Sequence, residues 1–216
     1  MTNEQINKLN AAIEKEYIKA RAPGSFVDLD KLQDIANEIV DSGDADWAKK
    51  VYIKALQNSS EYDIFVFQNA HEFFKSDRDV VLAAVKAWGP ALQYVDEKFK
   101  SDREILLATK PYLPAALNYA DESFRKDREI IMEAINQCEE GRIGSVIEEA
   151  DVSLQKDRDV VLAAVKKDGL ALQYADKSLQ KDKEIVLAAL KQNGFALEYA
   201  SEELQNDPEL QKLAEG

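Results

Sequence analysis

Residues 156–180 and residues 181–205 are two consecutive versions of one sequence, KDRDVVLAAVKKDGLALQYADKSLQ and KDKEIVLAALKQNGFALEYASEELQ. The same period sets the spacing of a series of aspartates, Asp77, Asp102, Asp127, Asp157, Asp182 and Asp207. Each interval in that series is 25 residues, except for one of 30 residues. A period in this range indicates a protein that stacks one small structural unit many times.

The residues that follow each aspartate predict the start of a helix, which we call helix A. Aspartate is a favoured N-cap residue, and here a basic residue, a first-turn acid and an apolar run such as VVLAAV come after it. Pro208 follows the last aspartate, and proline is preferred at the first helical position. We expect helix A to run for about 11 residues and to end where Gly169 and Gly194 take the left-handed conformation. Residues 160–165 are apolar all round, which predicts that protein covers helix A on most sides.

A second helix, helix B, is predicted from sequences such as ALQYA, with Leu172, Ala175 and Leu179 on one buried stripe. Asp176 either lies within helix B or caps a final short turn that holds Leu179. Two short helices cannot bury both of their faces alone, so the units must stack on one another. The predicted fold is all-α, a right-handed α-solenoid of tandem 25-residue two-helix repeats. The expected copies are 76–100, 101–125, 126–155, 156–180 and 181–205, followed by a capping helix over 206–216.

Residues 1–75 lack the 25-residue motif but carry helical apolar periodicity. They are predicted to form an N-terminal cap of about four helices, with a diverged repeat over 46–75. The solenoid is therefore expected to begin with this cap and to continue into the regular copies.

The charge of the chain narrows the choice of partners. Twenty-eight basic and forty-one acidic residues give a formal net charge of −13, which repels phosphate backbones and anionic lipid. The chain contains no apolar run of membrane-spanning length, and its single cysteine, Cys138, fits a reducing compartment. We therefore expect a cytoplasmic monomer that binds neither nucleic acid nor membrane.

The sequence offers little reactive chemistry. His71 is the only histidine, so zinc sites with two or more histidines are impossible, and a structural or exposed role is the simpler interpretation. Cys138 shares the apolar face of a helix with Ile131, Ala134 and Ile135, as a buried inert thiol would. The prediction is that the protein is not an enzyme and has no catalytic residue, no cofactor and no metal.

The repeat resembles a known family. KDREI, KDRDVVLAAVKKDGLALQYADKSLQ and KDKEIVLAALKQNGFALEYASEELQ are similar to the tandem repeat of domain of unknown function forty-one sixteen, over about 76–207. That family occurs in bacterial and protist proteins, including some secreted effectors, so a host cytosol is a further possible location. Within GDADWAKKVYIKAL, residues 44–56 more weakly resemble tetratricopeptide-like helical hairpins. The resemblance implies tandem helical repeats and, by analogy, a role in binding or targeting.

Two neighbouring copies depart from the repeat. In 101–125, Lys110 replaces an apolar residue, and Pro111 and Pro114 require helix A to stop early or kink. In 126–155, five extra residues are present, and Glu149 stands where the other copies have a tyrosine. One interpretation is sequence drift. The other is that 109–114 and 136–149 shape a groove or bend that exposes the side chains Lys110, Tyr112, Arg142 and Glu149.

Trp88 is a further candidate anchor, because it replaces the polar Asp168 and Asn193 of later copies. Packing onto the N-terminal cap would explain it equally well. The predicted function is a non-catalytic scaffold that mediates protein–protein interaction through Trp88, Lys110, Tyr112, Arg142 and Glu149. The alternative is an acidic effector or inhibitor that occupies a basic site, including a nucleic-acid-binding site, on a target protein.

Overall fold

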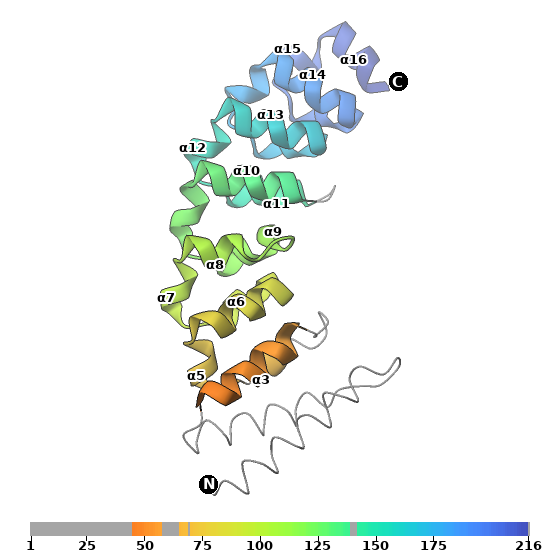
Figure 1. Cartoon of the computed structure of the whole chain (residues 1–216). Coiled ribbons are helices and arrows are strands. Elements are labelled where there is room, and N and C mark those ends of the chain that lie inside the picture. The colour runs from red at the N-terminus through yellow and green to blue at the C-terminus, as the bar shows by residue number, and fades with distance from the viewer. Residues whose placement is uncertain (1–44, 58–64, 69, 139–141, 216) are drawn as a thin grey trace, which may run out of the picture. The chain divides into compact units, whose positions relative to one another are not determined.

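The computed structural model describes residues 45–57, 65–68, 70–138 and 142–215 (Figure 1). Within these ranges every regular element is a helix, and none is a strand. The chain divides into two compact units, Met1–Ala120 and Asp121–Gly216. The helices predicted before residue 45 lie outside the described residues.

The first unit carries nine described helical segments. They are α3 (Ala45–Gln57), α4 (Phe65–Gln68), α5 (Glu72–Lys75), α6 (Arg78–Ala87), η2 (Gly89–Tyr94), α7 (Glu97–Lys100), α8 (Arg103–Leu107), α9 (Leu113–Ala116) and η3 (Leu117–Tyr119). Helix α6 packs between α3 and α8, and η2 covers its other side. Tyr52 of α3 stacks on Phe74 of α5 with 4.5 Å between the ring centroids, which joins α3 to the short helix that precedes α6.

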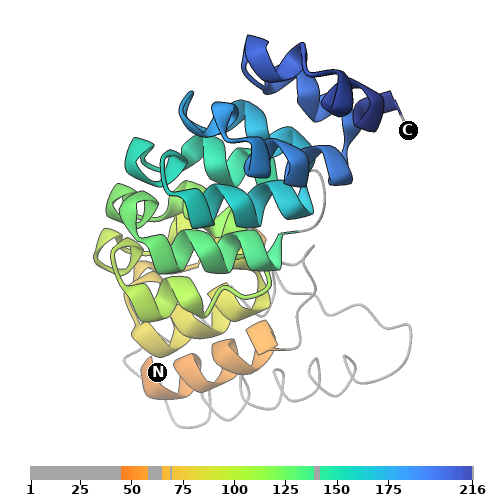
Figure 2. The same ribbon diagram turned by 90° about the horizontal axis from the view of Figure 1, so that it is seen from above.

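The second unit carries eleven described segments. They are η4 (Glu122–Lys126), α10 (Arg128–Gln137), α11 (Ile143–Glu149), α12 (Val152–Gln155), α13 (Arg158–Lys167), η5 (Gly169–Tyr174), η6 (Leu179–Lys181), α14 (Lys183–Gln192), η7 (Gly194–Tyr199), α15 (Glu202–Gln205) and α16 (Pro208–Glu215). Helix α13 packs between α10 and α14, and α14 packs against α16 (Figures 1 and 2). Each helix A in this unit therefore contacts the next helix A along the chain.

The predicted N-caps of helix A are confirmed. In α13, Oδ1 of Asp157 accepts hydrogen bonds from the backbone N–H groups of Asp159 and Val160, and the other copies repeat this arrangement. The helix then runs for ten residues in α6, α10, α13 and α14. Helix α8 has only five residues, as the prolines after it predict.

Each repeat contains a third helical segment in addition to the two that were predicted. Helix B is a 3₁₀ helix in the regular copies, and a short segment follows it. Asp96 and Asp151 cap such segments, and Oδ1 of Asp176 likewise accepts from the N–H of Ser178 at 3.0 Å. The open question about Asp176 is thereby decided in favour of a cap.

The repeated glycine has a different role from the predicted one. Neither Gly169 nor Gly194 has a left-handed backbone. A Cβ on Gly169 would lie 2.4 Å from the carbonyl oxygen of Ala189, and one on Gly194 would lie 2.2 Å from that of Ala214. Glycine is required here because the next helix A approaches the backbone too closely for any side chain.

Gln180, the last residue of copy 156–180, joins that copy to the next one. The side-chain amide of Gln180 donates to the carbonyls of Leu172 and Gln173, which closes the open end of η5. The backbone carbonyl of Gln180 accepts a 2.9 Å hydrogen bond from the N–H of Ser201 in the following copy. Gln180 is only 4% exposed, so both contacts satisfy polar groups that are removed from water.

Ion pairs also connect successive copies within each unit. In α6, α10, α13 and α14, the first basic residue of helix A reaches the N-cap aspartate and the first-turn acid of the next helix A. The pairs are Arg78 with Asp102 and Glu104, Arg128 with Asp157 and Asp159, Arg158 with Asp182 and Glu184, and Lys183 with Asp207 and Glu209. These pairs are exposed, and exposed pairs contribute only about 0–1 kcal/mol each.

Candidate functional site

One side of helix A is open to solvent, contrary to the expectation that protein covers it on most sides. In α13, Val160, Val161, Ala164 and Val165 are buried, but Leu162 and Ala163 are only half-buried. Helix α14 repeats the pattern, with Leu187 and Ala188 half-buried. The apolar residues of helix A therefore serve two purposes, since one set forms the core and the other lines the surface.

The open sides of α13 and α14 form a groove in the second unit, which we call groove 2. Its volume is about 450 Å³. Apolar side chains from both helices make its floor, and charged side chains stand at its edges. The lining residues are Leu162, Lys166, Glu184, Leu187, Ala188, Lys191 and Gln192.

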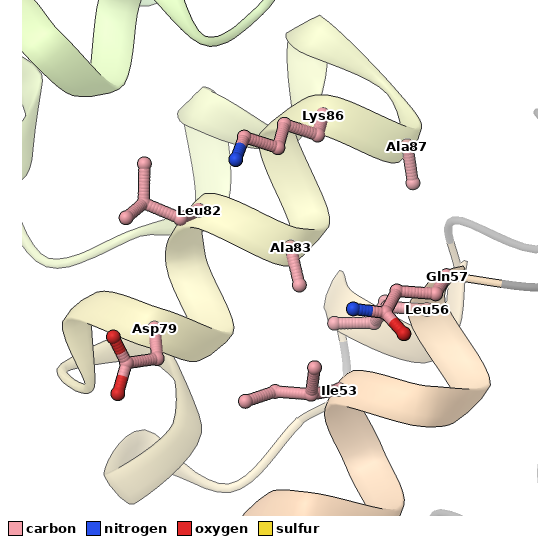
Figure 3. Close-up of a pocket in the computed structure, with 8 residues that line it drawn as sticks. All are labelled: Ile53, Leu56, Gln57, Asp79, Leu82, Ala83, Lys86 and Ala87. Carbon is pink, nitrogen blue, oxygen red and sulfur yellow. The ribbon is translucent and has the colours of Figure 1, made fainter.

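The first unit has a similar groove between α3 and α6, which we call groove 1. Its volume is about 420 Å³. Figure 3 shows Ile53 and Leu56 of α3 facing Ala83 of α6, with Asp79 at one end and Lys86 toward the other. The two remaining apolar residues, Leu82 and Ala87, also belong to α6.

The two grooves occupy the same register of the repeat. Counted from the N-cap aspartate, the second residue is Asp79 in α6 and Glu184 in α14. The fifth and sixth residues are Leu82 and Ala83 in groove 1, and they correspond to Leu187 and Ala188 in groove 2; the ninth are Lys86 and Lys191. The second helix of each groove, α6 or α14, therefore presents equivalent side chains at the same register.

The acids at the edges of both grooves already have partners. Asp79 Oδ2 lies 2.6 Å from Nζ of Lys49, and this contact lowers the pKa of the aspartate and raises that of the lysine. The guanidinium of Arg158 bonds Glu184 in the same way. The negative charges of the grooves are therefore largely balanced within the protein.

The lysines at the opposite edge have no such partners among the described residues. Lys86, Lys166 and Lys191 are exposed, and none of them makes a hydrogen bond or ion pair with another described residue. They lie in the last turns of α6, α13 and α14, where the negative end of the helix dipole favours a cation. Each groove thus combines an apolar floor with an unbalanced positive edge.

Of the candidate residues predicted in the first unit, Tyr112 lies against the residue that follows Trp88. Trp88 is half-buried and ends α6, and the next residue, Gly89, has the Cβ of Tyr112 against it. Tyr112 is half-buried at the start of α9, whereas Lys110 is exposed. Whether these residues bind a partner stays a prediction.

The other two candidates stand at opposite ends of α11 in the second unit. Arg142 is exposed and precedes the helix, whereas Glu149 is half-buried at its last residue. Seven residues of helix separate them by about 10 Å. A carboxylate oxygen of Glu149 lies 4.0 Å from the guanidinium of Arg125, so Glu149 faces a basic neighbour where other copies place a tyrosine.

His71 and Cys138, the remaining residues with reactive side chains, each lie at the end of a helix. Nδ1 of His71 accepts a hydrogen bond from the N–H of Phe73, so His71 caps α5 in the register where later copies have aspartate. Cys138 is buried, 7% exposed, at the end of α10. The described ranges contain no cluster of three or more His, Cys, Asp or Glu residues able to hold a metal. They also contain no helix with the length and apolarity needed to cross a membrane.

The sequence interpretation missed the groove residues, although a signal was present. The apolar face and the final lysine recur together in α6, α13 and α14, as Leu82 with Lys86, Leu162 with Lys166 and Leu187 with Lys191. The helix dipole favours a cation in the last turn, and here an apolar residue recurs four places before that cation. The sequence alone does not distinguish this lysine from the exposed charges that usually serve solubility.

Comparison with known proteins identifies the repeat. A family model described as "Domain of unknown function (DUF4116)" matches five overlapping segments, 77–109, 112–155, 142–180, 157–205 and 182–214. Together these segments span more than half of the chain. No curated protein and no solved structure matches it. The overlapping matches confirm the resemblance and the tandem organisation.

Proposed function

The chain belongs to the DUF4116 family, and from that premise we propose that it is a non-catalytic scaffold that binds another protein through the open sides of its A helices. The observation that carries the proposal is the repetition of one apolar groove, between α3 and α6 and again between α13 and α14. Half-buried leucines at equivalent surface positions offer apolar area that a partner can cover.

The proposed architecture is a right-handed α-solenoid, in which each added repeat would add a similar binding element. Solenoid proteins commonly bind through extended surfaces of this kind, because their inner helices repeat the same side chains. A protein with a single cysteine, Cys138, is suited to the cytoplasm, which is where we propose that it acts.

The alternative function, occupation of a basic site by an acidic surface, rests on the net charge of −13. The ion-pair series argues against it, because the acids at the start of the A helices are bonded to arginine or lysine of the preceding copy. To bind a basic site on a target, those carboxylates would have to leave their present arginine or lysine partners. The groove proposal needs no existing ion pair to break.

A capture experiment with the full chain tests the proposal. The immobilised protein is exposed to a lysate of its source organism, in parallel with the double variant Leu162→Asp, Leu187→Asp and with Val152→Asp. Val152 is an exposed valine of α12, 58% accessible, and its change makes the same replacement of apolar by acidic outside the groove. Proteins retained by the wild type and by Val152→Asp, but lost with the double variant, support the groove.

The result that would overturn the proposal is equal retention by all three proteins. If retention is equal and also disappears in high salt, the acidic-surface alternative gains support, because screening weakens exposed charge pairs more than apolar contacts. Circular dichroism melting of each variant shows whether it is folded. A second double variant, Leu162→Ser, Leu187→Ser, replaces the first if aspartate disturbs the helices.

A further inference from the structure

The charged side chains of groove 2 that have no partner among the described residues are all positive. Its single acid, Glu184, is bonded to Arg158, whereas Lys166 and Lys191 are exposed and have no partner among the described residues. The chain as a whole carries −13, so this positive edge is opposite in sign to the average surface. A partner that covers the groove gains attraction by presenting carboxylates to these two lysines.

The helix dipole alone accounts for a lysine in the last turn of a helix. It does not account for the half-buried leucine that lies beside each lysine. Each of these lysines lies four residues after a half-buried leucine, Leu162 before Lys166 and Leu187 before Lys191. Residues four apart are neighbours on the surface of a helix. Groove 2 therefore presents two matched pairs, and each pair combines one apolar and one cationic side chain.

The distance between the two pairs limits the conformation of the partner. Helices packed side by side have axes about 8–10 Å apart, so equivalent residues of α13 and α14 repeat at about that spacing. Residues seven apart in an α-helix lie about 10.5 Å apart on the same face. In an extended strand, residues three apart also lie about 10 Å apart, but the side chains of these two residues point to opposite faces.

We propose that groove 2 binds an amphipathic helix of another protein, with two apolar side chains seven residues apart and acidic residues beside them. The apolar side chains cover Leu162 and Leu187, and the carboxylates meet Lys166 and Lys191. This inference rests on the proposed scaffold function and assigns a chemistry to its partner. Groove 1 offers one matched pair, Leu82 with Lys86, to the same kind of helix.

A peptide-display selection tests the inference without knowledge of the natural partner. A phage library of random 16-residue peptides is selected on the immobilised full chain, and binders retained by the Leu162→Asp, Leu187→Asp variant are discarded. The expected pool is acidic, with large apolar residues seven apart. Selected peptides are then synthesised, and their dissociation constants are measured by fluorescence anisotropy.

Charge reversal at the groove provides the decisive comparison. With Lys166→Glu, Lys191→Glu, binding of the selected peptides is expected to weaken by about tenfold or more, because two attractions become repulsions. The control is Lys177→Glu, Lys181→Glu, which makes the same change in net charge on exposed lysines of the same unit outside groove 2. It is expected to change the dissociation constant by less than about twofold.

The outcomes separate the inference from the proposed function. If the peptides require the leucines but are not acidic, or bind equally well after the reversal at Lys166 and Lys191, the acidic-helix inference is wrong and the scaffold proposal stands. If the groove variant and the wild type select the same peptides, or if nothing is enriched, both are contradicted. Selected peptides that are acidic but show no helix when bound, by circular dichroism, overturn the helical conformation.

Discussion

The regular copy 156–180 and the irregular copy 101–125 begin alike and end differently. Both open with a capping aspartate, Asp157 or Asp102, whose carboxylate accepts two backbone N–H groups. Helix α13 then continues for ten residues, whereas α8 stops after five. At the register of Lys166, in the last turn of α13, the irregular copy has Pro111 outside any helix. The two copies therefore share their start and differ in the turns that carry the groove lysine.

The shortened copy is still well packed. Thr109 is fully buried and its hydroxyl donates a 2.6 Å hydrogen bond to the carbonyl of Leu106, while Leu113 and Ala116 are also buried. Tyr112 occupies the space beside Gly89. This packing favours the interpretation that the irregular residues fill space left by a shorter helix. The regular copies, rather than this irregular one, supply helix A residues to the grooves.

The largest expected effect comes from giving the regular copy the proline that the irregular copy has at the same register, Pro111. Lys166→Pro puts a proline in the last turn of α13, where it removes a backbone hydrogen bond and clashes with the preceding turn. We expect the free energy of unfolding to fall by about 3 kcal/mol, measured by urea denaturation. Lys166→Ala is the control and should change stability by less than about 0.5 kcal/mol. Equal stability of the two variants would mean that the end of α13 is not held as a helix.

The second prediction concerns the close approach at Gly169. In Gly169→Ala the new Cβ meets the backbone carbonyl of Ala189, which cannot move without shifting α14, so the variant should lose about 1–3 kcal/mol. The control is Gly144→Ala, where the nearest atom is Cε2 of Tyr174 at 2.9 Å, the far part of a side chain. Because that ring can turn aside and alanine favours a helix, the control should lose less than Gly169→Ala in the same denaturation experiment. A larger loss in the control would contradict the role assigned to Gly169.

The third prediction separates the cap of α14 from its ion pair. Asp182→Ala removes both the hydrogen bonds to the N–H groups of Glu184 and Ile185 and the pair with Arg158, so about 1 kcal/mol of stability should be lost. Asp182→Asn keeps an oxygen that can cap and loses only the charge. It should retain most of the stability in thermal denaturation. If both variants were equally unstable, the ion pair would matter more than the cap.

The smallest expected effect is the acid dependence of the ion-pair series. The hydrogen bond from Arg128 lowers the pKa of Asp157, and that from Lys183 lowers the pKa of Asp207. A carboxyl whose folded-state pKa is lowered adds stability above its unfolded pKa of about 4, and this stability disappears as the pH falls through the folded-state value. Melting temperatures should therefore be level from about pH 5 to 8 and fall below about pH 4.

The variant Arg128→Met tests the source of that acid dependence. It should lower the melting temperature slightly at pH 7 and should make the decline below about pH 4 less steep, because Asp157 loses the largest cause of its lowered pKa. Lys126→Met is the control, since the Nζ of Lys126 lies 4.0 Å from Asp151 and makes only a distant contact. A decline that is equally steep in all three proteins would place the acid-sensitive groups elsewhere.

Local signals in the sequence predicted the parts of the fold that depend on neighbouring residues along the chain. A few consecutive residues were enough to predict the capping aspartates and the start of each helix A. The same holds for the early end of α8 after Leu107. The family resemblance followed from the same 25-residue period. The third segment of each repeat was visible only as an ambiguity at Asp176, because a short helix offers too few residues to show a period.

By itself, the sequence determined an all-helical tandem repeat, where its A helices begin, and the chemistry that caps them, since these depend on contacts over three or four residues. Only the tertiary structure decided which side of helix A stays open, because Leu162 and Val161 are equally apolar and differ only in whether a neighbouring helix covers them. It also decided that Gly169 makes room for Ala189, 20 residues further along the chain. Burial and close approach are properties of the stack, and a helix cannot specify them until its neighbours are in place.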